Sequence, residues 1–147
     1  MTTIVRMLAV TSLMLLASLA QAQNKVPSER GLEALVKATL LTFNDANVTG
    51  NYEVFHAKLS KPFREQFSVE RLARRFQEFN KKHIDFDVIT ALKPGYDAAP
   101  KVDDEGRLLV KGHFPTEPLR VNFDLAFVPS DGEWKLISIN VKIDDPK

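Results

Sequence analysis

The 147-residue sequence contains no cysteine. The chain therefore forms no disulfide bond, offers no thiolate ligand to a metal ion and has no thiol nucleophile. This excludes cysteine-dependent catalysis, thiol–disulfide redox chemistry and cysteine-rich zinc sites. A fold without such cross-links depends on its hydrophobic core, to which the 10 phenylalanines contribute large apolar side chains.

The sequence also lacks a charge excess of either sign. It has 20 basic and 19 acidic residues, and Arg6 is the one charged residue of the first 22, so residues 23–147 carry 20 − 1 = 19 basic and 19 acidic side chains. A neutral domain has no electrostatic footprint for nucleic acid or for an anionic membrane surface. We therefore expect no nucleic-acid partner.

A third feature that is missing is an apolar run of the roughly 20 residues that cross a bilayer. The apolar stretch Met7–Leu19 is shorter, follows the basic Arg6 and ends at Ala20-Gln21-Ala22. This order is typical of a secretory signal peptide with an A-x-A cleavage site. An uncleaved N-terminal anchor is the alternative, and the short apolar stretch disfavours it. We predict cleavage after Ala22, a periplasmic or secreted location and no stable membrane anchor.

Cleavage leaves 147 − 22 = 125 residues. A chain of this length buries enough apolar surface to fold as one domain without cross-links. All of the phenylalanines lie in this part of the sequence. We therefore predict a single domain over residues 23–147.

The first half of this domain has the apolar spacing of helices. We expect a helix from Ser28, its N-cap, to about Asn47, a second from Tyr52 to about Leu59, and a third from Ser68 through Phe79. Residues 60–67, which include Pro62, are interpreted as a connection.

The second half alternates apolar and polar residues, which indicates strands over residues 84–92, 108–114, 121–127 and 134–143. Residues 94–106 are expected to form a loop, and Ser130-Asp131-Gly132 a tight turn. The apolar face changes between Leu136 and Ile137, which predicts a β-bulge or one wide apolar patch. The fold class is therefore α+β, with N-terminal helices packed on one face of a curved antiparallel four-stranded sheet.

This order of elements, which closes with Asp131-Gly132-Glu133-Trp134-Lys135-Leu136-Ile137, resembles the nuclear transport factor 2-like superfamily, a cystatin-like α+β roll. The resemblance spans roughly Ser28 to Ile143. Residues 61–67 are too few for the hairpin that many members insert between the second and third helices, so the chain is similar to a variant without it. The resemblance implies a sheet that curls around a pocket, into which the enzymes of the superfamily point ionisable groups.

The alternation in the predicted strands places only non-ionisable side chains on the inward face. The ionisable strand residues have the opposite parity and should face outward: Asp85, Asp87, Lys111, His113, Arg120, Asp124 and Lys142. General acid–base catalysis needs a titratable group positioned in a cleft. We therefore predict no catalytic residue, no metal site and no cofactor.

The predicted ligand-binding residues are Tyr52 and His56, one turn apart on the second helix, together with Phe86, Phe114 and Phe123 from the strands. They favour an exported, non-catalytic domain that holds a small apolar ligand or pairs with a second copy through the outer face of its sheet. The alternative is a small isomerase, cyclase or dehydratase in which Tyr52 and His56, with Asp45 as a third member, transfer protons.

Three further patterns each have a functional and a structural interpretation. His83, Asp85 and Asp87 alternate and could bind a metal ion, but alternating polar residues are the usual outer face of a strand. Asn47-Val48-Thr49 matches a glycosylation acceptor, which stays open. Basic residues gather around the third helix, but interleaved glutamates favour a solvated, ion-paired face.

Overall fold

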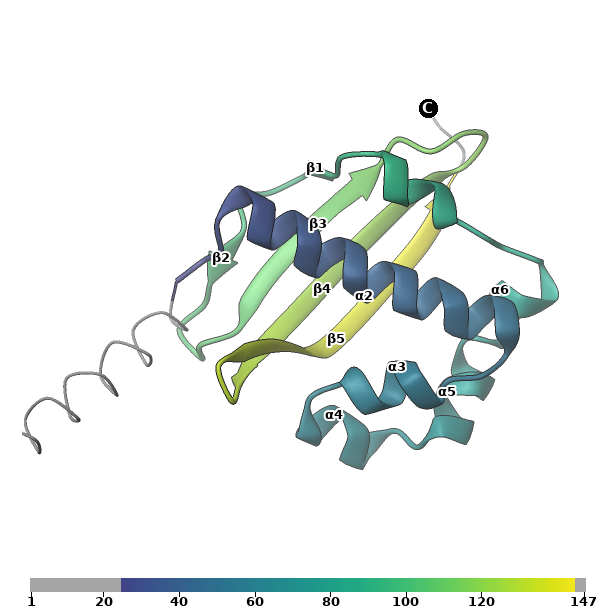
Figure 1. Ribbon diagram of the computed structural model, residues 1–147, viewed down its shortest axis with the longest axis horizontal. Coiled ribbons are helices and arrows are strands. Elements are labelled where there is room, and N and C mark those ends of the chain that lie inside the picture. The colour runs from purple at the N-terminus through teal and green to yellow at the C-terminus, as the bar shows by residue number, and fades with distance from the viewer. Residues whose placement is uncertain (1–24, 145–147) are drawn as a thin grey trace, which may run out of the picture.

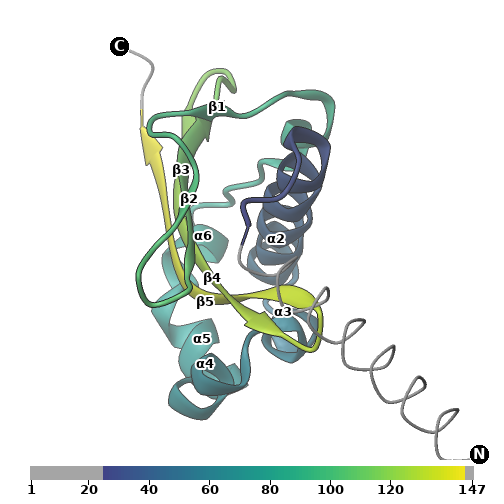
Figure 2. The same ribbon diagram turned by 90° about the vertical axis from the view of Figure 1, so that its left-hand side faces the viewer.

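The computed structural model describes residues 25–144 and shows an α+β fold in which one long helix lies across a curved antiparallel sheet (Figures 1 and 2). The predicted signal peptide, residues 1–22, lies outside the described residues. Within the described part of the chain, no helix combines the length and apolar character needed to cross a membrane.

Helix α2 (Glu29–Thr49) confirms the first predicted helix. The Ser28 hydroxyl accepts a hydrogen bond from the backbone N–H of Gly31 at 3.2 Å, and this satisfies one of the free donors at the helix start. The helix ends at Gly50, whose φ of 73° favours glycine. Its inner side buries an apolar row against the sheet, made of Leu32, Val36, Leu40 and Phe43.

Four short helices follow: α3 (Glu53–Lys58), α4 (Lys61–Gln66), α5 (Val69–Arg75) and α6 (Gln77–Lys81). Helix α3 confirms the second predicted helix. The connection predicted over residues 60–67 is wrong, because α4 forms there with Pro62 in its first turn, where the missing N–H is not needed. Ser68 caps α5 as predicted. The third helix is broken at Phe76, however, so that α6 is separate.

The strand predicted over residues 84–92 is also wrong. Its centre forms the 3₁₀ helix η1 (Asp87–Ala91), in which side chains three apart share a face. Phe86 and Ile89 are therefore buried, whereas Val88 is 48% exposed. As a result Asp85 and Asp87 do not lie on the outer face of a strand.

The sheet has five strands instead of the four predicted: β1 (Gly95–Tyr96), β2 (Lys101–Val102), β3 (Leu108–Phe114), β4 (Arg120–Ser130) and β5 (Glu133–Asp144). Its order is β1-β3-β4-β5, and β2 pairs with the opposite end of β3. The two short strands formed within the predicted loop. The tight turn is confirmed, with positive φ at Asp131 and Gly132.

The predicted bulge is confirmed as well. Ala126 pairs with Ser138 and Phe127 with Leu136, so Ile137 is the extra residue of β5. Along β3 and β4 the inward side chains are buried as expected, and the ionisable residues Lys111, His113, Arg120 and Asp124 alternate with them on the outer face.

The core lies between α2 and the inner face of the sheet, and α3 to α6 close one end of it (Figure 2). Phe43 is central to this core. The centre of its ring lies 4.8 Å from the centre of the Phe76 ring and 5.3 Å from the centre of the Phe79 ring, and both contacts are edge-to-face. These contacts join the short helices to the long one.

Gly112 in β3 is needed for the approach of β1. A Cβ atom at position 112 would lie 2.1 Å from the Gly95 carbonyl oxygen and 2.9 Å from the Phe123 ring. We expect Gly112→Ala to lower the free energy of unfolding by about 1–3 kcal/mol through overpacking, measured by urea unfolding. Gly95→Ala is the comparison, because the three atoms nearest to a Cβ at position 95 belong to the His113 side chain, which can shift more easily than backbone. Equal losses in the two variants would contradict this explanation.

Candidate functional site

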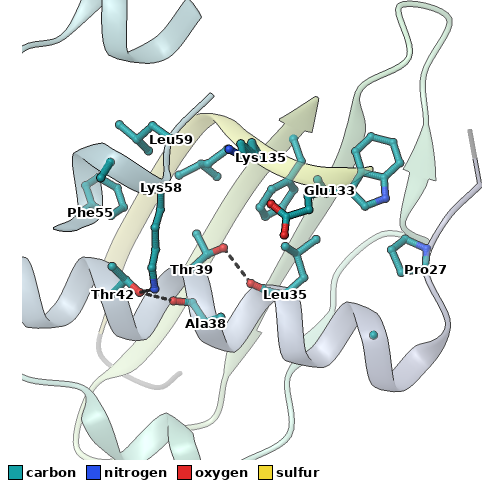
Figure 3. Close-up of a pocket in the computed structure, with 15 residues that line it drawn as sticks. Pro27, Leu35, Ala38, Thr39, Thr42, Phe55, Lys58, Leu59, Glu133 and Lys135 are labelled. Carbon is teal, nitrogen blue, oxygen red and sulfur yellow. Dashed lines mark hydrogen bonds between the residues drawn. The ribbon is translucent and has the colours of Figure 1, made fainter. Parts of the chain in front are cut away.

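A cavity of about 600 Å³ lies between α2, α3 and the tip of the β4–β5 hairpin (Figure 3). Its walls are mainly apolar. The side chains that form them include Leu35 and Ala38 of α2, Phe55 and Leu59 of α3, and Phe127, Trp134 and Leu136 of the hairpin.

The bulge at Ile137 builds one wall of this cavity. Leu125 and Ile139 form an inward-facing pair below the bulge, so an uninterrupted register would turn Leu136 and Trp134 outward. The extra residue restores them to the inner face, opposite Phe127 and Pro129. Bulges also bend a strand and increase its twist, and Figure 2 shows the hairpin tip curving toward α3.

Two hydroxyl groups lie among the apolar residues. Thr39 donates its hydroxyl proton to the Leu35 carbonyl at 2.8 Å, and Thr42 donates to the Ala38 carbonyl at 2.7 Å. Each hydroxyl oxygen keeps acceptor capacity, because its single proton is already engaged.

Two lysines line this cavity, and Lys58 is the one on its helical side. Figure 3 shows its side chain reaching from α3 toward α2, where Nζ donates to the Thr42 hydroxyl at 3.4 Å. Glu133 and Lys135 line the hairpin side. The site therefore combines an apolar interior with a few polar groups, which is the usual make-up of a small-molecule binding site.

The residues predicted to bind ligand lie elsewhere. Phe86, Phe114 and Phe123 are buried in the core. The ring centres of Phe114 and Phe123 are 5.7 Å apart. Tyr52 is only 2% exposed. None of the four is among the residues that line the cavity, although Phe86 borders a smaller one of about 200 Å³ near the end of β5.

His56 does not line the cavity either, although its neighbours Phe55 and Ala57 do. The side chain is half-buried, and its Nε2 atom has no hydrogen-bond partner among the described residues. Hydrogen bonds from the Glu70 backbone N–H and from Ser68 are the main causes that lower the pKa of Glu70, at the start of α5, and His56 is a lesser cause of the same shift.

Tyr52 belongs to a buried polar cluster. Its hydroxyl donates to the Asn47 side-chain oxygen, and the Asn80 side chain donates to the Asn47 carbonyl at 2.8 Å. Burial raises the pKa of Tyr52 to about 12, so the phenol stays protonated at neutral pH. Asp45 is exposed and does not complete a proton-transfer set with Tyr52 and His56.

The cluster also bears on the glycosylation motif. Asn47 is fully buried, so in the folded protein its side chain is not accessible for modification. Val48 and Thr49, by contrast, are exposed.

The structure does not assemble the metal site considered for His83, Asp85 and Asp87. Asp85 instead accepts hydrogen bonds from the Asn44 side chain at 2.7 Å and from the backbone N–H of Asp87 at 3.1 Å. No three metal-ligating side chains lie together among residues 25–144. His113 is on the outer sheet face, 2.8 Å from Asp97.

The basic residues around α5 have structural contacts of their own. The guanidinium groups of Arg71 and Arg75 lie 5.2 and 5.8 Å from the centre of the Phe67 ring. Arg71 also donates to the Gln66 carbonyl at 2.8 Å, and Arg64 donates to the Leu59 carbonyl. These contacts favour the interpretation as a solvated helix face over an anion site.

The sequence contained one signal for the cavity, the change of apolar face between Leu136 and Ile137. The contribution of Ala38, Thr39 and Thr42 had no such signal, because these residues lie beside the apolar row of α2. Comparisons of the chain with protein-family models, with curated proteins and with solved structures found no match.

The raised pKa of Tyr52 predicts a pH-dependent loss of stability. A tyrosine ionises near pH 10 in the unfolded chain and near pH 12 in the fold, so stability is complete below pH 10 and falls as the pH rises through this window. We expect the wild type to lose about 1.4 kcal/mol from this group by pH 11.

Tyr52→Phe lacks this loss but leaves the Asn47 oxygen without its donor, at a cost of about 1–2 kcal/mol near neutral pH. The difference in unfolding free energy between the two proteins should therefore shrink between about pH 8 and pH 11, as measured by urea unfolding. A difference that stays constant with pH would argue against a buried, neutral Tyr52. Tyr96 is common to both proteins and cancels in the comparison.

Proposed function

We propose that this chain is an exported, non-catalytic binding module that holds a small, largely apolar ligand in the cavity between α2, α3 and the β4–β5 hairpin. The observation that carries the proposal is the cavity itself, whose volume of about 600 Å³ falls within the range of small-molecule sites. Its walls combine core residues such as Phe55 and Phe127 with Leu35 and Trp134, which are only half-buried although the main apolar row of α2 is covered.

The export part of the proposal rests on the signal-peptide pattern of residues 1–22. Likeness to the nuclear transport factor 2-like superfamily stays a prediction, supported by the helix order and by the turn at Asp131 and Gly132. The alternative proton-transfer enzyme has less support, because Tyr52 is engaged with Asn47 and neither Tyr52 nor His56 lines the cavity.

The polar groups of the cavity suggest the chemistry of the ligand. The Lys58 ammonium group has one long contact, to Thr42, and keeps donors for a ligand. Thr39 offers an acceptor in the apolar wall. We therefore expect a ligand with an apolar body and an acidic group near Lys58.

Trp134 is the single tryptophan of the sequence and lines the cavity, so its fluorescence reports on binding. The neutral apolar probe N-phenyl-1-naphthylamine should bind the mature wild type and quench this emission. Ala38→Phe places a ring in the cavity and should weaken binding by about tenfold, which corresponds to about 1.4 kcal/mol.

Ala99→Phe is the matched control, because Ala99 is exposed in the loop between β1 and β2 and does not line the cavity. It should bind the probe like the wild type. If Ala38→Phe also binds like the wild type, the probe occupies another place and the proposed site is wrong.

A second experiment tests the role of Lys58. Lys58→Gln keeps a polar side chain of similar length but removes the charge. It should weaken binding of the anionic probe 1-anilinonaphthalene-8-sulfonate by about three- to tenfold, since exposed charges contribute modestly. Binding of the neutral probe should not change. An equal effect on both probes would mean that Lys58 acts through the shape of the cavity instead of its charge.

A further inference from the structure

The cavity proposed as the ligand site is extended along α2. Its lining on this helix includes residues that share one face of the helix: Gly31, Leu35, Ala38 and Thr42. Gly31 and Thr42 are 11 residues apart, which corresponds to a length of about 16 Å at the rise per residue of an α-helix. The site is therefore long in one direction.

The two ends of this cavity differ in charge. Lys58 lies at the end marked by Thr42, to whose hydroxyl oxygen its ammonium group donates at 3.4 Å. Figure 3 shows Pro27 at the opposite end, where Gly31 also lines the cavity, and neither of these residues is ionisable. The first end therefore suits a carboxylate, and the second suits an apolar group.

The charged residues of the hairpin do not remove this difference. Glu133 and Lys135 line the cavity on the hairpin side. They alternate along β5 with Trp134 and Leu136, which face inward. Together with Lys58, the lining contains two lysines and one glutamate, so its net charge is +1. One anionic group on the ligand would balance this charge.

Apolar side chains bound the cavity between its two ends. Leu35 and Ala38 lie on the side of α2, and Phe127 and Leu136 on the side of the hairpin. An extended alkyl chain advances about 1.3 Å per carbon, because C–C bonds of about 1.5 Å meet at tetrahedral angles. A chain of about 12 carbons therefore matches the length of about 16 Å along α2.

We infer that the ligand is a linear, medium-chain carboxylic acid of about 10–12 carbons, with its carboxylate at Lys58 and its terminal methyl group at Gly31. This inference rests on the proposed function, to which it adds the shape, the direction and the length of the ligand. A compact ring system with the same number of carbons would leave the far end of the cavity empty.

Gly31 sets the length of the ligand in this arrangement. A Cβ atom at position 31 would lie 3.3 Å from the Ser28 hydroxyl oxygen and 3.5 Å from the Pro27 Cβ atom, so a small shift accommodates it. A leucine at this position keeps the backbone N–H that Ser28 caps. Its side chain would fill the far end of the cavity and leave Lys58 in place.

Displacement of N-phenyl-1-naphthylamine from the mature wild type measures the affinity of each acid. From octanoate to dodecanoate, we expect the affinity to rise about two- to fourfold per added methylene group. Hexadecanoate should bind no more tightly than dodecanoate, because its last carbons extend past Gly31 into solvent. The neutral 1-dodecanol should bind about three- to tenfold more weakly than dodecanoate, and Lys58→Gln should abolish this difference.

Gly31→Leu tests the direction of the ligand. It should weaken dodecanoate binding by about tenfold, because the leucine occupies the place of the last carbons. Octanoate is the matched control, since a chain of about 10 Å ends before Gly31 and should bind the variant like the wild type. In Lys58→Gln, by contrast, both acids should lose the same factor.

The outcomes separate this inference from the proposed function. If the neutral probe binds the wild type and Ala38→Phe weakens its binding, but the acids do not displace it, the inference is wrong and the proposed function stands. The inference is also wrong if affinity does not depend on chain length, or if Gly31→Leu weakens both acids equally. A neutral probe that Ala38→Phe does not affect would instead contradict the proposed function itself.

Discussion

The β-bulge at Ile137 is the local constraint on which the ligand site depends. Above it, the extra residue turns Trp134 and Leu136 onto the inner face, where they meet Phe127 and form the cavity wall. At the same point, the backbone N–H of Ser60, just before α4, donates to the Leu136 carbonyl. Below it, β5 continues as a regular strand that pairs with β4. One inserted residue therefore lets a single strand serve both as a wall of the ligand site and as a regular part of the sheet.

The cavity requires that α2 stays fixed over the sheet, and hydrogen bonds at the C-terminal end of the helix fix it. The Asn44 side chain donates to Asp85 and accepts from the backbone N–H of Phe86 at 3.0 Å. The Asn47 side-chain oxygen accepts from Tyr52 and its backbone carbonyl accepts from Asn80, whereas its Nδ2 atom has no partner among the described residues. Buried amides stabilise when their partners are present, so Asn44 does most to specify one position for the helix. Its N-terminal half has no such bonds on the side of Leu35 and Thr39, and there the cavity is open.

How much of this could be predicted follows from the periodicity of each segment. Helix α2 and strands β3 to β5 have one dominant period, and even the bulge was visible because the apolar face changes at Leu136. Residues 84–92 have apolar side chains at intervals of both two and three, so their pattern fits a strand and a 3₁₀ helix alike. The site was harder to predict. The alternation of apolar and polar residues along the strands indicates that Phe114 and Phe123 face the inner side of the sheet. It does not tell whether a cavity or packed side chains lie there, and in the structure both residues are buried in the packed core.

The inner face of β3, β4 and β5 carries no ionisable side chain. This removes the positioned acid or base that proton-transfer chemistry would need at the sheet. The charged and hydroxyl groups at the cavity come instead from α2, α3 and the hairpin tip, where they lie at the margin of an apolar wall. Such an arrangement can orient a ligand by one polar group while its apolar body is buried, which favours binding over catalysis.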